Sequence, residues 1–447
     1  MSIKRVLIAN RGEIALRAIR SLKESGKEAV AVYSVGDKDA SYLNMADVKV
    51  CIGGVKAKDS YLNIPAIITA AELSECDAIF AGYGFLSENP HFVEVCEHHG
   101  KKFIGPNAKT IALMGNKSKA KETMIKAGVP VVPGTAKPLD SVDEAKKIAG
   151  EIGYPVILKA SSGGGGKGMR IVEDDKGVEK AFLSAESEAI ASFGDGSIYI
   201  EKFIDSPRHV EVQILADKHG NVVHLGDRDC SLQRRHQKLI EESLSTFLSE
   251  ETRQKLYKTT LEAAKYIGYE GAGTIEYLVD KDENFYFMEM NTRLQVEHPV
   301  SEMITGIDIV DWMVKIAEGE TLFSQEDIKF SGHSIECRIT AEDPRKFMPS
   351  AGEITKVFVP GGMHVRFDSH IYGGYFVPPY YDSMIGKLIV WGVDRSDAIN
   401  RMKRALDELS IEGIKTTIPF HKEMMKNDDY INNRIDTRYL ERFLSRV

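Results

Sequence analysis

Four consecutive glycines, Gly163 to Gly166, lie in the stretch KASSGGGGKGMR and constrain the fold more than any other feature of the sequence. Ordering such a run is costly, because glycine loses more backbone entropy on folding than any other residue. The run is flanked by PVILKA and GMRIV, two apolar runs of strand length. Two such runs around a glycine loop predict a strand–loop–strand flap with the glycines at its tip.

This glycine loop does not match the common nucleotide-binding P-loop. That pattern needs a glycine five residues before the Gly–Lys pair and a serine or threonine after it. Here Ser161 and Gly168 occupy those two positions. Glycines without Cβ still let successive backbone N–H groups approach phosphate oxygens, and Lys159 and Lys167 flank the run. We therefore expect a phosphate-binding flap, with a flexible surface hairpin as the alternative.

The N-terminal part of the chain alternates strand-like and helix-like patterns. KRVLIAN reads as a buried strand, EIALRAIRSLKESG as an amphipathic helix and EAVAVYS as the next strand. This alternation predicts an α/β unit with a parallel sheet. The first strand–helix turn reads NRGE, so the GxGxxG fingerprint of dinucleotide-binding folds is missing.

Charge and cysteine usage exclude several classes of protein. The net charge of -8 argues against a nucleic-acid-binding surface, and no apolar run reaches the length of a membrane span. The five cysteines form no CxxC pair, which favours a reducing cytosol over a disulfide framework or a zinc cluster. For Cys230 we expect a buried structural thiol, with a nucleophile as the alternative.

The segment GTIEYLVDKDENFYFMEMN predicts a β-hairpin that carries a metal site. With a two-residue turn at Asp282–Glu283, Glu276 would face Glu289 across the strands. Asn291 lies two residues after Glu289 and therefore on the same face of its strand. Facing carboxylates repel, and together with an amide oxygen they suit Mg²⁺. The alternative is a solvated acidic face, which the aromatic and apolar neighbours in the second strand disfavour.

Three further polar clusters accompany this hairpin. The stretch after it supplies a forked donor and a general base beside the metal site. HVEVQ places three polar side chains on one strand face, and RDCSLQRRHQK is a cationic stretch that is either a solvated face or an anion-binding one. The chain combines a phosphate-binding flap, a hairpin with a predicted metal site and several lysines, and it lacks a P-loop. This combination predicts an ATP-dependent ligase of the ATP-grasp type. The residues in these clusters are Arg293, Gln295, Glu297, His298, His209, Glu211, Gln213, Gln233, His236 and Lys238.

Motifs along the whole chain resemble those of the biotin carboxylase family, the ATP-grasp components of biotin-dependent carboxylases. The resemblance covers essentially all 447 residues. Three positions depart from the family pattern: Ser162 replaces a glycine, Ala81 a proline, and SLSTF (243–247) an APSP-like run. The motifs are IANRGEIALR, GYGFLSEN, FIGP, LMGNK, KASSGGGGKGMR, EKFIDSPRHVEVQ, RDCSLQRRHQK, EMNTRLQVEHPVSEMITG, ECRITAED and YYDSMIGKL.

The family fold implies a multidomain chain of α/β and α+β class. A Rossmann-like (pre-ATP-grasp) domain is expected over residues 1–115, and a C-terminal biotin carboxylase domain over 330–447. Between them, residues 121–318 are expected to form the ATP-grasp domain, with a mobile glycine-rich lid over about 131–203. We expect the lid to be poorly ordered without nucleotide and to close on ATP, which keeps water from the intermediate.

The resemblance also implies contacts to ATP from the lid and the sheet. Lys117 and Lys159 are expected at the phosphates, and Glu201 and the backbone after it at the adenine. Two Mg²⁺ or Mn²⁺ ions are expected at the predicted metal site of Glu276, Glu289 and Asn291. The expected ATP-binding residues are Lys117, Lys159, Gly163, Gly164, Gly165, Gly166, Glu201, Lys202, Ile204, His209, Gln233, His236, Glu276 and Glu289.

For the reaction, the resemblance implies that ATP, bicarbonate and biotin give ADP, phosphate and N-carboxybiotin. Glu297 is expected to act as base on bicarbonate, which then attacks the γ-phosphate to give carboxyphosphate. Arg338 in ECRIT is expected to bind biotin and to stabilise the enolate that accepts the carboxyl group. The expected bicarbonate-binding residues are Lys238, Arg293, Gln295, Val296 and Glu297.

The absence of a biotinylation motif and the resemblance to the family together imply the partners of this chain. There is no AMKM-type biotinylation motif, so biotin is expected on a separate carrier protein that also serves separate carboxyltransferase subunits. We expect a cytoplasmic homodimer that binds neither nucleic acid nor membrane. The parent enzyme is expected to be acetyl-CoA carboxylase of fatty-acid synthesis, with pyruvate or another acyl-CoA carboxylase as the alternative. A different ATP-grasp ligase and a non-catalytic ATP-binding subunit are the remaining alternatives.

Overall fold

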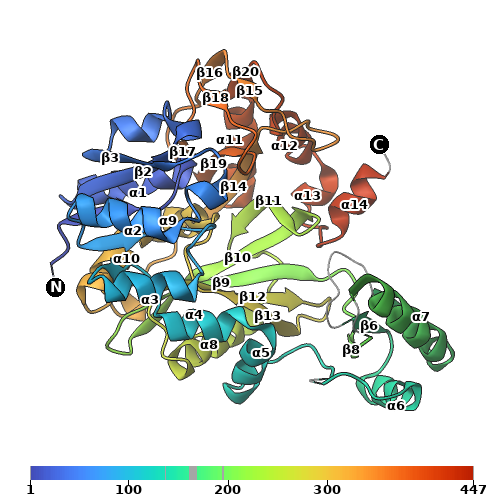
Figure 1. Cartoon of the computed structure of the whole chain (residues 1–447). Helices are drawn as coiled ribbons and strands as arrows, with labels where there is room; N and C mark the ends of the chain where they lie inside the picture. Colours follow the sequence, from blue (N-terminus) through green and yellow to red (C-terminus); the bar gives the residue numbers. More distant parts are fainter. Residues whose placement is uncertain (1, 136, 161–168, 194–195, 446–447) are drawn as a thin grey trace.

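The computed structural model describes residues 2–135, 137–160, 169–193 and 196–445. They form a body of mixed α and β structure and a small part that projects from it (Figure 1). The expected combination of α/β and α+β structure is confirmed. The body contains an N-terminal parallel sheet and one large, mainly antiparallel sheet, and the projecting part has a sheet of its own.

The N-terminal part is the predicted α/β unit. Its five parallel strands lie in the order β3-β2-β1-β4-β5. Helix α1 forms because Ile14, Ala18 and Leu22 recur every four residues and bury one face against the sheet. The elements are β1 Arg5–Ile8, α1 Gly12–Glu24, β2 Glu28–Ser34, η1 Val35–Asp37, η2 Ser41–Asn44, β3 Val48–Gly53, η3 Ala57–Asp59, α2 Ile64–Leu73, β4 Ala78–Phe80, α3 Pro90–His98, β5 Lys102–Phe103 and α4 Ala108–Gly115.

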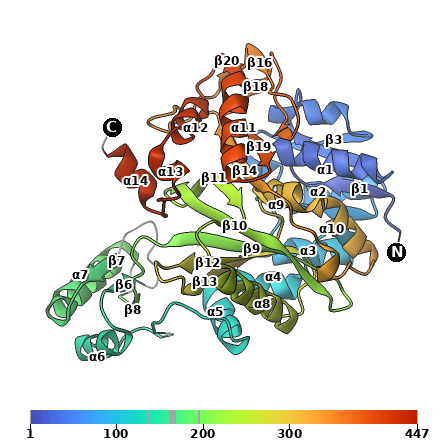
Figure 2. The same cartoon turned by 180° about the vertical axis from the view of Figure 1, so that it is seen from behind.

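The projecting part contains the predicted flap. Strands β6 and β7 pair antiparallel, with Lys159 opposite Met169, and β8 pairs on the other edge of β6. This part has its own small core, which includes Leu158, Phe182 and Ile200, and it stands away from the body in both views (Figures 1 and 2). The elements are α5 Lys117–Lys126, α6 Val142–Ile152, β6 Val156–Ala160, β7 Met169–Val172, α7 Asp175–Phe193 and β8 Ile198–Lys202, of which α5 packs on the body.

The large sheet has eight strands in the order β13-β12-β9-β10-β11-β14-β19-β17. Helices α8, α9, α10 and α11 pack against it. Strands from the middle of the chain and from its C-terminal third share it, because β11 pairs with β14. The elements are β9 Arg208–Ala216, β10 Val222–Arg234, β11 Gln237–Ser243, α8 Glu250–Tyr266, β12 Gly271–Val279, β13 Phe285–Asn291, α9 His298–Thr305, α10 Ile309–Glu318, β14 His333–Thr340, β17 Val365–Ser369, β19 Met384–Gly392 and α11 Arg395–Glu408.

Short elements complete the C-terminal third. Two two-stranded sheets, β15 with β18 and β16 with β20, lie beside the large sheet. Among the described residues, no helix is both long and apolar enough to cross a membrane. The elements are η4 Gln325–Asp327, β15 Gly352–Glu353, β16 Lys356–Phe358, β18 Phe376–Val377, β20 Ser410–Glu412, α12 Ile418–Met424, α13 Asp428–Ile431 and α14 Tyr439–Leu444.

A buried ion network connects α1, α9 and β17. The Glu302 carboxylate accepts hydrogen bonds from Arg17 and from Arg366, each at 2.7 Å. Arg366 also forms a forked ion pair with Asp368, at 2.9 and 2.6 Å. Burial alone would raise the pKa of Glu302, but the two guanidinium groups hold it well below its usual range. The network therefore joins three segments that lie far apart in the sequence.

Candidate active site

One face of the large sheet carries two adjacent rows of polar side chains, in which each residue faces its register partner on the next strand. The rows exist because polar and apolar residues alternate along the strands, and alternate side chains point to opposite faces. On β9, for example, Val210, Val212 and Ile214 belong to the hydrophobic core below the sheet. The rows are Glu289–Glu276–Glu211–Arg228 and Asn291–Thr274–Gln213.

The β12–β13 hairpin confirms the predicted carboxylate pair but not the predicted turn. The loop is one residue longer: the Asp280 N–H donates to the Asn284 carbonyl at 3.0 Å, and Asp280 Oδ1 accepts from the Asn284 N–H at 2.9 Å. The longer loop shifts the pairing by one residue. A β-bulge at Met288 shifts it back, so Glu276 faces Glu289 after all.

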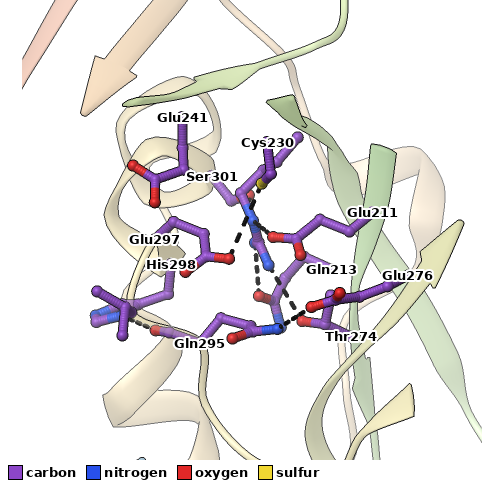
Figure 3. Close-up of polar contacts among 12 residues, drawn as sticks. Glu211, Gln213, Cys230, Glu241, Thr274, Glu276, Gln295, Glu297, His298 and Ser301 are labelled. Atoms are coloured by element: carbon purple, nitrogen blue, oxygen red, sulfur yellow. Dashed lines mark hydrogen bonds and ion pairs between the residues drawn. The ribbon is translucent and has the colours of Figure 1, made fainter. Parts of the chain in front are cut away.

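Arg228 fills the interior end of the first row. Its side chain is fully buried and donates to Glu211 Oε1 at 2.6 Å, Gln213 Oε1 at 2.7 Å, and the hydroxyls of Thr274 and Ser301 at 3.1 Å each. These four partners are labelled in Figure 3. The cationic stretch that contains Arg228 is therefore no solvated face here. This guanidinium orients β9, β12 and α9 with respect to one another.

Lys238 lies at the centre of three carboxylates. Its Nζ donates to Glu211 Oε2 at 2.6 Å, Glu276 Oε1 at 2.9 Å and Glu297 Oε1 at 2.6 Å. Burial alone would lower the pKa of Lys238, but the surrounding anionic groups raise it well above its usual value, so the ammonium form persists. Cys230 lies 3.9 Å from Glu297 Oε1; burial raises the pKa of its thiol well above 9.0, as expected for a structural thiol.

Glu297 and Arg338 form the second ion pair of this centre. Arg338 Nη2 donates to Glu297 Oε2 at 2.8 Å, and its Nε donates to Glu241 Oε1 at 2.5 Å. Burial alone would raise the pKa of Glu297, but Lys238 and Arg338 hold it well below its usual range. Burial raises the pKa of Glu241 to about 7, although Arg338 opposes that shift. Glu297 is thus an ionised carboxylate held between two cations.

Arg293 reaches from the loop after β13 to the N-terminal part. It donates to Glu88 Oε2 at 2.9 Å, Gln295 Oε1 at 2.7 Å and Asn291 Oδ1 at 2.8 Å. The amide nitrogens of Asn291 and Gln295 in turn donate to Glu276 Oε1, each at 2.8 Å. The arginine, two amides and a carboxylate therefore form one connected network beside Lys238.

The residues expected near the adenine lie at the base of the projecting part. Lys159 Nζ donates to Glu201 Oε2 at 2.6 Å, and Lys121 Nζ to Glu201 Oε1 at 3.2 Å. Lys202 Nζ donates to the Gly153 and Tyr154 carbonyls, so its backbone is the part that remains for a nucleotide. Ile204 follows and is half-buried.

Lys117 and Glu289 line the same cavity. The cavity has a volume of about 260 Å³ and lies between α4, α5 and β13. Lys117 is exposed at the first residue of α5. The glycines expected at the phosphates, Gly163, Gly164, Gly165 and Gly166, lie outside the described residues, as does Ser162.

His209 and Gln233 reach the site, whereas His236 lies on a turn. His209 Nε2 is 2.8 Å from Glu276 Oε2, and Gln233 Nε2 is 3.4 Å from His209 Nδ1. His236 is exposed in the two-residue β10–β11 turn, where it and Arg235 both adopt positive φ angles of 67° and 49°. Positive φ at both positions is typical of the type I′ turns that close hairpins.

The hairpin carboxylates suit a cation between them. Burial and the facing Glu276 raise the pKa of Glu289, because two carboxylates in register repel. A bound metal ion would relieve that repulsion. The amide oxygen of Asn291 is hydrogen-bonded to Arg293, so it would have to leave that partner to join the metal. A second group, His209 with Glu211 and Glu276, also brings three ligand atoms within 4.8 Å of one another.

The departure SLSTF has a structural explanation. The Ser245 N–H donates to Asp227 Oδ2 at 2.6 Å, and its hydroxyl donates to Asp229 Oδ2 at 2.8 Å. Phe247 packs under the Arg208 guanidinium, 5.0 Å from the ring centre. This segment therefore anchors the start of α8 to β10 and does not line the centre around Lys238.

Sequence reasoning left three members of the centre without a role. Arg228 and Glu241 flank predicted residues, and Glu88 lies in GYGFLSEN, but none of them was expected at the site. Glu211 was placed on the correct strand face without its contacts. For Glu211 the available signal was a charged residue inside a largely apolar strand, β9, which is uncommon unless the charge is paired. Arg228 and Glu241 lie in polar-rich strands and Glu88 in a loop, so the same signal was not available for them.

Family models match the chain almost throughout. Residues 2–111 match the biotin carboxylase N-terminal domain, 116–325 the ATP-binding domain of the carbamoyl-phosphate synthase L chain, and 336–442 the biotin carboxylase C-terminal domain. The ATP-binding match covers the projecting part and the hairpin, and the C-terminal match begins at Glu336, two residues before Arg338.

Known proteins resemble the chain over its full length. A biotin carboxylase from a Nostoc species is 53% identical over 443 residues, covering 99% of both chains. The structure of a Campylobacter jejuni biotin carboxylase–β-γ-ATP complex is 63% identical, with a TM-score of 0.91 and 99% of both chains covered. The biotin carboxylase domain dimer of Hydrogenobacter thermophilus 2-oxoglutarate carboxylase, with MgADP, ADP and bicarbonate, is 51% identical, with a TM-score of 0.89 over 99% of this chain and 98% of that one.

Proposed function

Because the chain belongs to the biotin carboxylase family, we propose roles for its residues in the ATP-dependent carboxylation of biotin. The chain is a biotin carboxylase, an ATP-dependent ligase that uses bicarbonate. One observation carries the assignment of roles: Glu297 lies between Lys238 and Arg338, beside the network of Arg293 and Gln295. Lys238 and Arg338 thus offer two sites for anions, and Glu297 offers a base between them.

We propose that the lid and the hairpin hold ATP. Lys117 and Lys159 bind the phosphates, together with Gly163 to Gly166. Glu201 and the backbone of Lys202 and Ile204 meet the adenine, and His209, Gln233 and His236 lie along the nucleotide. The cavity that Lys117 and Glu289 share supports the phosphate assignment. Phosphoryl transfer needs chiefly positioning and charge neutralisation, which lysines and metal ions supply.

For the metal ions we propose Glu276, Glu289 and Asn291 as ligands of two Mg²⁺ or Mn²⁺ ions. The facing carboxylates and their mutual repulsion support this assignment. When bound, such ions would neutralise the phosphate charge of ATP. The residues of this chain orient the site: Lys238 and Gln295 both donate to Glu276 Oε1 and hold that carboxylate in place.

We propose that bicarbonate displaces protein partners within the centre. Its oxygens would take donors from Lys238, Arg293, the Gln295 amide and the Val296 N–H. Loss of the direct Lys238 contact would raise the pKa of Glu297, since that contact helps to hold it low. Glu297 Oε1 then accepts the bicarbonate proton. The bicarbonate oxygen forms a bond to the γ-phosphorus as the bond to ADP breaks, which gives carboxyphosphate.

Arg338 acts in the second half of the proposed mechanism. The enolate of biotin carries a negative charge on its ureido oxygen, and a fixed guanidinium stabilises such a charge. Two carboxylates and the His421 contact to its carbonyl hold Arg338 in place. The ureido nitrogen of biotin forms a bond to the carboxyl carbon as the carbon–oxygen bond of carboxyphosphate breaks, and the departing phosphate takes the ureido N–H proton, which completes the reaction.

For organisation, we propose an N-terminal domain over 1–115, an ATP-grasp domain over 121–318 with its lid over about 131–203, and a C-terminal domain over 330–447. The separate small core of the projecting part supports the lid assignment. We further propose a cytoplasmic homodimer that works with a separate biotin carrier protein and carboxyltransferase subunits. The parent enzyme is acetyl-CoA carboxylase in this proposal, and a pyruvate or other acyl-CoA carboxylase is the alternative.

The decisive test measures ADP release with bicarbonate and biotin added separately and together. Arg293→Ala and Glu297→Gln should each lower bicarbonate-dependent ADP release by about 10²-fold or more, the usual contribution of a positioned proton acceptor or a charge clamp. ATP affinity, measured by calorimetry, should stay within about twofold. Glu326→Gln, at an exposed position away from the site, serves as the control. Equal losses in ATP affinity would show that Arg293 and Glu297 serve the nucleotide instead.

Two further measurements decide between the alternatives. Turnover with an amine in place of bicarbonate and biotin would indicate a different ATP-grasp ligase. The acyl acceptor of the parent enzyme can be identified only with its carboxyltransferase partner. We expect the carboxyltransferase that copurifies with the chain to carboxylate acetyl-CoA. Copurified carboxyltransferase that acts on pyruvate alone would contradict the acetyl-CoA assignment.

A further inference from the structure

Two sequence motifs meet in the body without a role in the mechanism above. Glu13 comes from NRGE and Lys387 from DSMIGK, and both side chains are almost completely buried. Lys387 Nζ lies 3.4 Å from Glu13 Oε1 and donates a hydrogen bond to the Val296 carbonyl at 2.7 Å. A buried ammonium is costly unless it is paired. Here one N–H of the Lys387 ammonium donates to the backbone carbonyl between Gln295 and Glu297.

The preceding carbonyl is held in the same way. His298 Nδ1 lies 2.7 Å from the Gln295 carbonyl (Figure 3). Because a carbonyl only accepts, Nδ1 carries the proton. Burial, with Lys387 nearby, lowers the pKa of His298 well below 6.5, so the ring stays neutral. Two consecutive peptide groups, those of Gln295 and Val296, are therefore each fixed by a buried side chain.

Peptide planarity determines where the two amide hydrogens point. In a trans peptide the C=O and the following N–H point in opposite directions. With the Gln295 carbonyl held by His298, the Val296 N–H must point away from that ring. Among the described residues the Val296 N–H has no hydrogen-bond acceptor. The neighbouring side chains, Gln295 and Glu297, both contact the centre around Lys238.

We propose that Lys387 and His298 are positioning residues that preorganise the 295–297 backbone, and with it the Val296 N–H, for bicarbonate. Among the described residues, Glu13 is the carboxyl group in ion-pair range of the Lys387 ammonium, and burial raises the pKa of Glu13 to about 7, against the pull of Lys387. This inference rests on the bicarbonate site proposed above and assigns two residues that do not touch the substrate. Fixing the backbone before binding removes an ordering cost from the bound state.

The first test replaces Lys387 by methionine together with Glu13→Gln, which avoids leaving a lone buried charge. The double variant should raise KM for bicarbonate by about 10–100-fold, the cost of a small misplacement in a preorganised site. ADP affinity, measured by calorimetry, should stay within about twofold. Lys27→Met is the matched control, since Lys27 Nζ also donates to a backbone carbonyl, that of Ile3, and to a carboxylate, that of Glu318. It should leave KM for bicarbonate unchanged.

A second pair of variants keeps the inference testable if the first does not fold. His298→Asn retains a donor near the position of Nδ1, whereas His298→Ala removes it. Rescue of KM by asparagine relative to alanine supports positioning through the carbonyl, and equal KM values for the two would overturn it.

Arg293→Ala separates this inference from the function on which it rests. If Arg293→Ala raises KM for bicarbonate while the Lys387 and His298 variants do not, the positioning inference alone fails. If none of the variants changes KM for bicarbonate, the proposed bicarbonate site fails with it.

Discussion

At the scale of single residues, the buried cations of the centre are shared among carboxylates. Lys238 contacts Glu211, Glu276 and Glu297, and Arg338 bridges Glu241 and Glu297. Removing one partner from such a group leaves a buried charge uncompensated, which is strongly destabilising. A substrate anion, in contrast, can take one partner's place and leave the charge balance intact. Buried cations that each contact several carboxylates therefore suit a site that a substrate anion must enter while the protein stays folded.

His421 links stability to pH. Its Nε2 donates to the Arg338 carbonyl at 2.7 Å, whereas its Nδ1 has no partner among the described residues. Burial lowers the pKa of His421 from 6.5 to about 4, because a second ring proton would have no acceptor. Between these values the unfolded chain binds the extra proton, so this contribution to stability is lost as pH falls.

We therefore predict a changed pH dependence for His421→Gln. Between pH 7 and pH 5 the unmodified protein should lose roughly 2 kcal/mol more unfolding free energy than the variant, as a pKa shift of this size implies. Urea unfolding at several pH values measures the difference. The same replacement at the exposed His91 should show no such effect; parallel pH profiles for both variants would contradict the assignment to His421.

At the scale of secondary-structure elements, the β12–β13 hairpin shows how far sequence patterns reach. Alternating residues predicted both strands and the facing pair of Glu276 and Glu289. The turn was wrong, because the Asp280 side chain binds the backbone at Asn284 and stabilises a longer loop. The bulge at Met288 restores the register. The facing pair was therefore predicted correctly, because the longer loop and the bulge, both missed from the sequence, shift the strand register by one residue in opposite directions.

The rest of the site could not be predicted from the sequence for a different physical reason. The contacts of Arg228, Glu241 and Lys387 arise from strands and helices that meet only in the folded sheet. Alternation states which face a side chain occupies but not which strand lies next to it. Motifs shared with the family indicated the region of the site, whereas the pairing registers of β12 with β9, β9 with β10 and β10 with β11 decide which charged side chains touch.

The hairpin also carries a metal prediction. Glu289→Gln should raise the Mn²⁺ concentration needed for half-maximal binding by about 10–100-fold, a loss that even supporting residues of metal sites cause. Electron paramagnetic resonance of Mn²⁺ with ADP present measures the binding directly. Asp282→Asn, in the exposed turn of the same hairpin, is the matched control. Unchanged Mn²⁺ affinity in Glu289→Gln would remove Glu289 from the ligands, and the group of His209, Glu211 and Glu276 would be tested next.

At the scale of the whole molecule, the ion network around Glu302 holds the N-terminal part against the large sheet. Glu302→Ala would remove the carboxylate that Arg17 and Arg366 share, while Asp308 and Asp368 remain as their other partners. We predict a loss of about 1.5–3 kcal/mol in unfolding free energy, typical of lost hydrogen bonds to charged groups. Urea unfolding tests this. Glu320→Ala, at an exposed position nearby, should change stability by less than about 0.5 kcal/mol; a similarly small effect at Glu302 would show that the network is replaceable.

The pairing of β11 with β14 has a consequence for how this enzyme can be divided. The match to the ATP-binding family ends at residue 325 and that to the C-terminal family begins at 336, yet one sheet runs across this boundary. A chain cut there would expose two unpaired strand edges, which invite association with other chains. The C-terminal third is therefore not a portable module. The projecting part has its own core and its own three-stranded sheet, so its separation would leave the large sheet closed.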